Sequence, residues 1–183
     1  MERPKFADQS LTRRPLVATM AIEPFAQQYF DELRRQHFPA ERNYLDAHIT
    51  LFHALPDVPW VMSQLEKFSK DQQPFQVSAH SVVSLGNGTA IKIDSKELSF
   101  ISRHLQKELS EMLTRQDRQK RNFHVTIQNK VDAMTAKQLL SNLTGIFCPF
   151  SFRVDGIKLW RYMDGPWEYL DKLNFSSAIH ATD

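Results

Sequence analysis

One short pattern occurs twice in this chain of 183 residues. Residues 48–51 read HITL and residues 124–127 read HVTI, so each segment runs histidine, apolar, threonine, apolar. Side chains alternate between the two faces of a β-strand, which places the histidine and the threonine of each segment on one face and the apolar residues on the other. The pattern therefore predicts two strands that each present an imidazole and a hydroxyl while the opposite face packs into a core.

The remaining sequence alternates between strand-type and helix-type segments around these two motif strands. Strands are predicted at 16–22, 45–54, 75–83, 90–93, 122–131, 150–161 and 167–174, and helices after Pro24, after an Asp57 cap, over 96–114 behind a Ser95 cap, and after a Thr135 cap. The order is β-α-β-α-β-β followed by α-β-α-β-β. We therefore expect an α+β fold with two related lobes, helices on the outer faces and the motif strands near the middle.

Composition narrows the class of protein. Cys148 is the only cysteine, which excludes an intramolecular disulfide framework and a cysteine-rich zinc site, and it is expected to be a buried structural thiol. The net charge of +2 does not by itself require a nucleic-acid partner. No apolar run approaches the roughly 18 residues needed to span a bilayer, and the N-terminus has no apolar signal core. We expect a cytoplasmic protein without membrane association, with residues 1–14 loosely ordered over the surface.

The residue types of the doubled motif predict acid/base chemistry. A single His-x-Thr segment is weak evidence for a site, whereas two copies, each in a predicted strand that precedes a helix, favour a functional interpretation. Histidine exchanges a proton near neutral pH, so a pair allows one imidazole to act as base while the other acts as acid. Threonine hydroxyls donate to anionic oxygens. This set suits a phosphate diester and requires neither a metal nor a covalent intermediate.

Metal binding is the main rival use of two histidines. Catalytic zinc usually has three protein ligands. No Asp, Glu or Cys shares the strand faces of His48 and His124, and the HExxH pattern is absent. The sequence therefore favours a site without a metal, and no cofactor is expected.

These residues identify a resemblance to a known family. The two motifs, together with the closing segment 157–170, which carries a glycine-containing turn and a tyrosine soon after it, resemble the two-histidine (2H) phosphoesterase superfamily, and within it bacterial 2′-5′ RNA ligase-like proteins. The likeness runs from about residue 15 onward. It implies a single bilobal domain over 1–183 with a pseudo-twofold axis, in which two mostly antiparallel sheets face a central cleft.

The resemblance also implies an activity and a partner. Such proteins carry out metal-independent phosphodiester chemistry, typically opening a 2′,3′-cyclic phosphate on RNA ends or nucleotides, and some join RNA ends through a 2′-5′ bond. Carried over by position, His48 and His124 are the acid/base pair, and Thr50 and Thr126 hold the phosphate. The family favours His124 as the base that activates water and His48 as the acid, although the symmetry of the two motifs does not distinguish them.

Further candidate contacts are less specific. Phe52 and Gln128 share the motif faces of their predicted strands, and Arg161 and Tyr169 belong to the last predicted hairpin. Strand alternation directs His53 away from His48, and no role is assigned to the other histidines, His37, His80, His104 and His180. The basic stretch Arg115, Arg118, Lys120 and Arg121 fits either a guide for an RNA backbone or a solvated loop.

Two further functions stay open at this stage. One is a phosphodiesterase for a small cyclic phosphate that is not RNA, which the modest net charge allows. The other is a non-catalytic RNA-binding module that uses the same cleft. The sequence determines neither the substrate, nor the direction of the reaction, nor the oligomeric state, and it implies no obligate protein partner.

Overall fold

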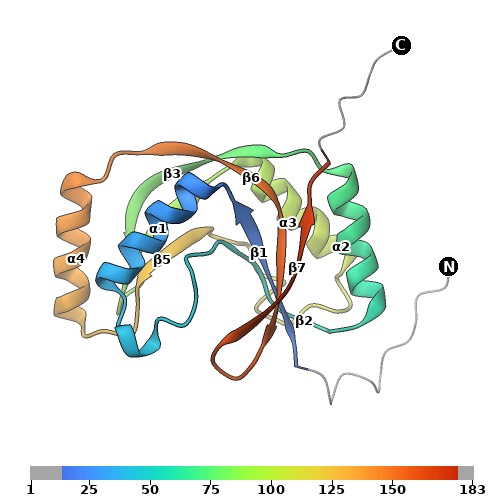
Figure 1. Cartoon of the computed structure of the whole chain (residues 1–183), viewed down its shortest axis with the longest axis horizontal. Coiled ribbons are helices and arrows are strands. Elements are labelled where there is room, and N and C mark those ends of the chain that lie inside the picture. Colours follow the sequence, from blue (N-terminus) through green and yellow to red (C-terminus); the bar gives the residue numbers. More distant parts are fainter. Residues whose placement is uncertain (1–13, 177–183) are drawn as a thin grey trace, which may run out of the picture.

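The structure, a computed structural model, describes residues 14–176, and its elements follow the predicted order (Figure 1). The expected loose order of residues 1–14 falls almost wholly outside this range. The strands are β1 (Leu16–Ile22), β2 (Thr50–Leu55), β3 (Phe75–Ser84), β4 (Thr89–Asp94), β5 (His124–Gln128), β6 (Phe150–Tyr162) and β7 (Trp167–Asn174). The helices are α1 (Pro24–His37), α2 (Pro59–Asp71), α3 (Lys96–Glu108) and α4 (Ala133–Ile146), with a short 3₁₀ turn at Ala40–Arg42.

The strands form one antiparallel sheet with the order β2-β1-β6-β3-β4-β5, and β7 pairs with β6 outside this path. The expected α+β class is therefore confirmed. The family resemblance implied two facing sheets, whereas the observed pairing is continuous because β6 pairs with strands of both parts. Residues 150–154 of β6 pair with β3, and residues 156–162 pair with β7, while β1 runs along the other edge.

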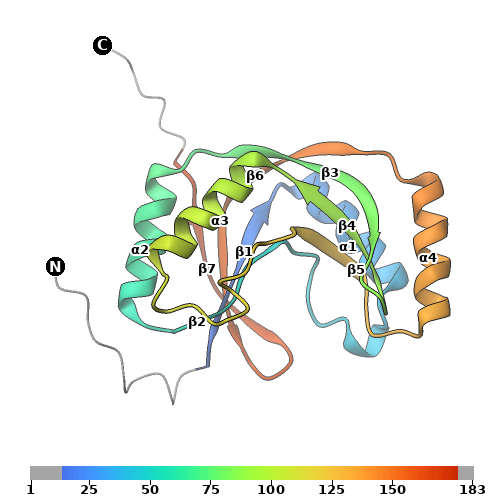
Figure 2. The same ribbon diagram turned by 180° about the vertical axis from the view of Figure 1, so that it is seen from behind.

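The two ends of this path meet again at the motif strands. Ile49, just before β2, forms an isolated antiparallel bridge with Val125 in β5. The backbone N–H of Met20 in β1 also donates to the carbonyl of Ile49 at 2.9 Å. The sheet therefore curls until the residues just before β2 meet β5 near the middle of the molecule (Figures 1 and 2).

The helices divide between two ends of the molecule. α4 packs on β3 and β4, and α1 packs on β5, whereas α2 packs on β7 and lies next to α3 at the opposite end (Figures 1 and 2). The apolar faces of these elements bury a continuous core, whose largest fully buried side chains include Phe30, Phe52, Phe152 and Met20. The helix α1 follows β1 in sequence but contacts the second motif strand, so it ties the two motif regions together.

Two predicted helix caps are corrected by the structure. Val58, not Asp57, is the N-cap of α2, and Asp57 pairs instead with Arg161. Asp132, not Thr135, caps α4, because its carboxylate accepts from the backbone N–H groups of Met134 and Thr135. The predicted Ser95 cap of α3 is confirmed by a 3.1 Å hydrogen bond from the Leu98 N–H.

Three further observations complete the comparison. α3 ends at Glu108 rather than continuing to residue 114, since the chain turns there into the basic stretch. Cys148 is exposed, so its expected burial is wrong: it lies in the short link after α4, outside the core. Among the described helices, none has the length and hydropathy that a bilayer-spanning segment needs.

Candidate active site

The bridge between the motif strands brings the two histidines and the two threonines together. In an antiparallel pair centred on Ile49 and Val125, His48 comes opposite Thr126, and Thr50 comes opposite His124. Ile49 and Val125 are fully buried, so the residues that flank them point to the other face of the sheet. All four motif side chains line one cavity of about 180 Å³, which we call the central cavity.

Each motif histidine is held by the backbone carbonyl two residues earlier in the chain. The Nδ1 of His48 lies 2.8 Å from the carbonyl oxygen of Asp46, and the Nδ1 of His124 lies 2.9 Å from the carbonyl oxygen of Asn122. A carbonyl oxygen can only accept, so Nδ1 carries the proton in both rings. The Nε2 of each imidazole is therefore free to take or give a proton, which is the arrangement that acid/base chemistry requires.

The central cavity has walls that are mainly polar. Besides the four motif residues it is lined by His53, Gln116, Gln119, Lys120, Arg121, Asn122 and Phe123. Most of these belong to the segment between α3 and β5, which contains the basic stretch. The cavity offers hydroxyl, amide and cationic donors around two imidazoles, and its charged side chains are cations. Such a lining favours an anionic ligand.

His53 lines the central cavity, although strand alternation predicted that it would face away. The pairing of β1 with β2 moves from Thr19–Thr50 to Ala18–Phe52, so one extra residue is accommodated in β2. Leu51 and Phe52 are consequently both buried, and His53 returns to the face of Thr50. The same irregularity places Phe52 in the core with no exposed surface, so it is not a substrate contact.

A buried carboxylate fixes this part of β2. Asp117 has no exposed surface and accepts from the backbone N–H groups of His53, at 2.8 Å, and Ala54, at 2.9 Å. It also pairs with Arg121 at 3.0 Å, and its Oδ1 lies 3.3 Å from the Nδ1 of His53. Burial alone would raise the pKa of Asp117, but these hydrogen bonds from His53 and Ala54 outweigh it and lower the pKa to about 2.

Two arginines each connect one motif region to the other by a hydrogen bond to a backbone carbonyl. Arg121, from the segment before β5, donates to the carbonyl of Leu51 in β2 at 2.8 Å. Arg34, from α1, donates to the carbonyl of Thr126 in β5 at 2.8 Å. Each motif strand is thus held by a cation that belongs to the other part of the chain. Burial lowers the pKa of Arg34 to about 10, so its guanidinium stays charged near neutral pH.

A second cavity, of about 120 Å³, opens on the other side of His48, and we call it the aromatic cavity. Its walls include Tyr44, Trp160 and Trp167, together with Lys158 and Asp46. The ring of His48 lies 4.8 Å from that of Trp167, centroid to centroid. The indole N–H of Trp160 donates to the hydroxyl of Thr19 at 2.9 Å, which fixes the orientation of this wall. His48 is therefore shared by two neighbouring cavities.

The surroundings of His48 shift its titration. Burial lowers its pKa to about 4, against the opposing hydrogen bond to the Asp46 carbonyl. The charge of Arg34 and the positive forms of His124 and His53 lower it further. At neutral pH His48 is therefore a neutral imidazole whose Nε2 lone pair faces the cavity.

Three other sequence candidates lie away from both cavities. Gln128 is only 5% exposed. The pairing of β4 with β5 is irregular here, so that Gln128 is buried although Ile127 before it is also buried. Arg161 is engaged by Asp57 and Glu168. Tyr169 is 53% exposed, pairs with Trp160 across the hairpin and packs edge-on against its ring. The structure thus pairs Arg161 with carboxylates and packs Tyr169 on Trp160, whereas Gln128 is buried and its Oε1 has no hydrogen-bond partner among the described residues.

Several cavity residues were missed by the sequence reasoning. Trp160 and Trp167 lie in the closing hairpin that carried the family resemblance, which was the available signal, and their rings lie 6.2 Å apart, centroid to centroid. Arg34 had no such signal, because its partner is a backbone carbonyl far away in the sequence. Within the basic stretch, Lys120 and Arg121 line the central cavity, whereas Arg115 and Arg118 line neither cavity.

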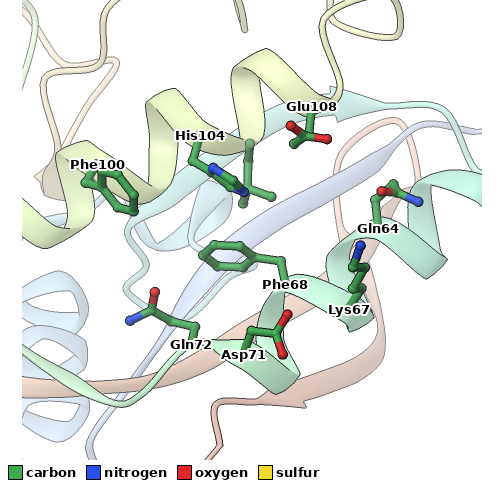
Figure 3. Close-up of a pocket in the computed structure, with 9 residues that line it drawn as sticks. Gln64, Lys67, Phe68, Asp71, Gln72, Phe100, His104 and Glu108 are labelled. Atoms are coloured by element: carbon green, nitrogen blue, oxygen red, sulfur yellow. The ribbon is translucent and has the colours of Figure 1, made fainter.

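A cavity of about 400 Å³ lies elsewhere, between α2 and α3 (Figure 3). His104 faces Phe68 there, with the two rings 5.6 Å apart, and both acidic and basic side chains line the walls. None of the predicted site residues reaches it. Across residues 14–176, no three His, Cys, Asp or Glu side chains gather as metal ligands.

Comparison with known proteins places the chain in a class. The structure is that of an α+β protein in which a curled antiparallel sheet brings two His-x-Thr motifs to one cavity. The sequence model of the 2′-5′ RNA ligase superfamily matches residues 22–166, so the chain belongs to this superfamily. No curated protein sequence matches the chain.

Solved structures share the fold at low sequence identity. E. coli LigT complexed with 3′-AMP aligns with a TM-score of 0.59 and 14% identity, covering 90% of this chain and 99% of that one. TT0787 of Thermus thermophilus aligns with a TM-score of 0.60 and 12% identity, covering 88% of this chain and 97% of that one. A further match, described as a phosphoesterase, has a TM-score of 0.59 and 13% identity, over 90% of this chain and 99% of the other.

Proposed function

We propose that this protein is a metal-independent phosphodiesterase that opens 2′,3′-cyclic phosphates on RNA ends or nucleotides. The observation that carries the proposal is the pair of imidazoles that line one cavity, each of which donates a hydrogen bond from Nδ1–H to a backbone carbonyl and leaves Nε2 for proton transfer. Membership of the 2′-5′ RNA ligase superfamily supports the same chemistry. LigT, which shares the fold, has been crystallised with 3′-AMP and with phosphate.

The reaction needs one proton acceptor and one proton donor on opposite sides of the phosphorus. One imidazole takes a proton from water as the water oxygen bonds to phosphorus. The bond from phosphorus to the 2′ or 3′ oxygen then breaks, and the other imidazole gives its proton to that oxygen. The hydroxyls of Thr50 and Thr126 donate to the non-bridging oxygens, whose charge grows in the transition state. If the 5′-hydroxyl of a second RNA attacks the same phosphorus in place of water, and the bond from phosphorus to the 3′ oxygen breaks, the product is a 2′-5′ bond.

The environments of the two histidines suggest how these roles are divided. The pKa of His48, about 4, leaves it unprotonated in the free enzyme at neutral pH. We therefore assign the base to His48 and the acid to His124, the reverse of the order that the family resemblance implies. A general base of low pKa is always available, while an acid of low pKa would be protonated in only a small fraction of molecules.

The aromatic cavity could bind the nucleoside that is attached to the phosphate. Tyr44 and Trp167 provide flat apolar surfaces beside His48, and Tyr44 is 64% exposed. Stacking of a base on an aromatic side chain is worth about 1–3 kcal/mol. A base bound there would place its ribose near the histidine pair.

The direct test is turnover of adenosine 2′,3′-cyclic phosphate and of RNA with a cyclic-phosphate end, in the presence of EDTA. We expect ring opening of both substrates at an unchanged rate when EDTA is added. Activity that EDTA abolishes would contradict the metal-independent mechanism. RNA binding without any product would point to a binding module, and turnover confined to non-nucleotide cyclic phosphates would point to a different substrate class.

A further inference from the structure

A third cavity, of about 330 Å³, adjoins the central cavity, and we call it the α3 cavity. It is lined by Ser99, Ser102, Arg103 and Gln106 of α3 and by Lys120, Arg121 and Phe123 of the segment that leads into β5. Lys120, Arg121 and Phe123 also line the central cavity, so the two cavities share a wall. The histidine pair thus has the aromatic cavity on one side and the α3 cavity on another.

The charged side chains that line the α3 cavity all have the same sign. Arg103, Lys120 and Arg121 are its charged wall residues, and all are cations. Arg121 is already paired with Asp117. Arg103 and Lys120 are exposed, and within residues 14–176 neither forms an ion pair with a carboxylate. The large cavity between α2 and α3 differs, because Asp71 and Glu108 accompany Lys67 there (Figure 3).

The wall that carries Lys120 is fixed to α3 by hydrogen bonds. The side-chain amide of Gln106 donates to the carbonyls of Asp117, at 2.8 Å, and Gln119, at 2.9 Å. Asp117 is in turn tied to β2 through the backbone of His53 and Ala54. The segment beside the α3 cavity is therefore held in place relative to the histidine pair, which makes the cavity a built extension of the site.

We propose that the α3 cavity binds the phosphate that precedes the terminal nucleoside of an RNA chain, so that the enzyme prefers 5′-phosphorylated or oligonucleotide substrates. This inference rests on the proposed phosphodiesterase function. A nucleoside 2′,3′-cyclic phosphate with a 5′-hydroxyl carries no second phosphate, whereas every longer RNA end does. Cations without carboxylate partners beside an anion site attract such a group. At about 330 Å³ the cavity is larger than the central cavity, at about 180 Å³, and leaves room for part of a neighbouring nucleotide.

The test compares kcat/KM for three substrates: adenosine 2′,3′-cyclic phosphate with a 5′-hydroxyl, the same compound with a 5′-phosphate, and a dinucleotide that ends in the cyclic phosphate. The wild-type protein is expected to prefer the second and third. Arg103 lines the α3 cavity and not the central cavity. Arg103→Gln should reduce the preference about fivefold, and Arg103→Glu should remove it, while turnover of the 5′-hydroxyl compound stays unchanged.

Arg118→Gln and Arg118→Glu are the matched controls, because Arg118 is an exposed cation of the adjoining loop that lines neither cavity. They should keep the preference. Equal losses in the Arg103 and Arg118 variants, or a wild-type protein without any preference, would overturn the proposal. A preference for the dinucleotide that the 5′-phosphate alone does not reproduce would also overturn it, since another part of the chain would then be recognised.

The two proposals fail in different ways. If the wild-type protein turns over none of the three substrates, the phosphodiesterase function is wrong, and the cavity is tested by binding alone. Fluorescence anisotropy with a labelled dinucleotide that ends in a 3′-phosphate would then compare wild type with Arg103→Glu. Weaker binding by the variant supports the α3 cavity as a phosphate site, and equal binding overturns it.

Discussion

The two motif regions share one bonding scheme but differ in their surroundings. In both, Nδ1 of the histidine meets the carbonyl two residues earlier, and the apolar residue between histidine and threonine is fully buried. His48, however, packs on Trp167, near the buried charge of Arg34, and its pKa falls to about 4. His124 lines the central cavity only, whereas His48 also lines the aromatic cavity. The shared His-x-Thr pattern therefore fixes the geometry, while residues distant in sequence set the protonation state of His48.

Each motif strand is held by residues that come from the other part of the chain. β2 is held by Asp117 and Arg121, which come from the segment before β5, and the carbonyl of Thr126 in β5 is held by Arg34 from α1. α1 also fixes Ala47, the residue before His48, because Asp31 accepts from its N–H and Gln27 donates to its carbonyl. Neither motif is thus positioned by its own part of the chain alone.

The strongest test of this comparison removes each imidazole in turn. His48→Ala and His124→Ala should each lower kcat for the cyclic phosphate by about 10² to 10⁴, the usual contribution of general acid or base catalysis. A nucleoside p-nitrophenyl phosphate diester releases a phenolate that needs little protonation. On this substrate His124→Ala should recover much of its rate and His48→Ala should not, if His48 is the base.

His80→Ala serves as the control, since this exposed histidine of β3 lines neither the central nor the aromatic cavity. The opposite pattern of recovery would give the base to His124. Wild-type rates in both motif variants, with unchanged circular dichroism spectra, would refute the assignment of the site.

The next largest effect concerns the anchor of β2. Asp117→Asn places an amide where the buried carboxylate accepts from His53, Ala54 and Arg121, and should lower the free energy of unfolding by about 3–5 kcal/mol. The folded-state pKa, about 2, lies below the ordinary value of 3.8, so the wild-type protein loses this stabilisation as pH falls from 3.8 through 2. The variant should lack that part of the acid slope in urea titrations at several pH values.

Asp94→Asn is the surface comparison for this change, because Asp94 is half-exposed and pairs with Lys92. It should cost at most about 1 kcal/mol. A similar cost for both variants would show that Asp117 does not anchor the strand.

The two threonines test the symmetry of the site. Thr50→Val and Thr126→Val keep the shape of the side chain and remove the hydroxyl, and each should lower kcat about 10²-fold, as loss of one donor to a developing oxyanion does. Steady-state kinetics on the cyclic phosphate measures both. Thr144→Val on α4 is the matched control. A large loss for one threonine and none for the other would mean that only one motif holds the phosphate.

The smallest expected effect isolates the environment of His48. Trp167→Ala should expose the imidazole and raise its pKa from about 4 toward 6.5, by about one unit, which corresponds to about 1.4 kcal/mol. An NMR titration of the ring protons measures the shift, and the His124 resonances of the same variant are the internal control. Because the wild-type protein loses stability as His48 is protonated between pH 6.5 and 4, the variant should also be less sensitive to acid in that range. An unchanged pKa would assign the desolvation to other neighbours.

The sequence was sufficient for what depends on local periodicity. The strand and helix order, the Ser95 cap and the buried faces of Ile49 and Val125 follow from patterns within a few residues. The position of His53 did not follow, because a single extra residue in β2 reverses alternation and is visible only in the pairing with β1. Arg34 could not be predicted either, since its partner is a backbone atom 92 positions away. The joining of two expected sheets through β6 likewise depends on tertiary pairing.

The main-chain acceptors of the two histidines have an evolutionary consequence. Asp46 and Asn122 contribute only their carbonyl oxygens to the imidazoles, so nearly any amino acid at these two positions preserves the tautomer. In enzymes that orient a catalytic histidine with a carboxylate side chain, one substitution can remove that control. Here the side chains at 46 and 122 can change without altering the hydrogen bond that orients each imidazole.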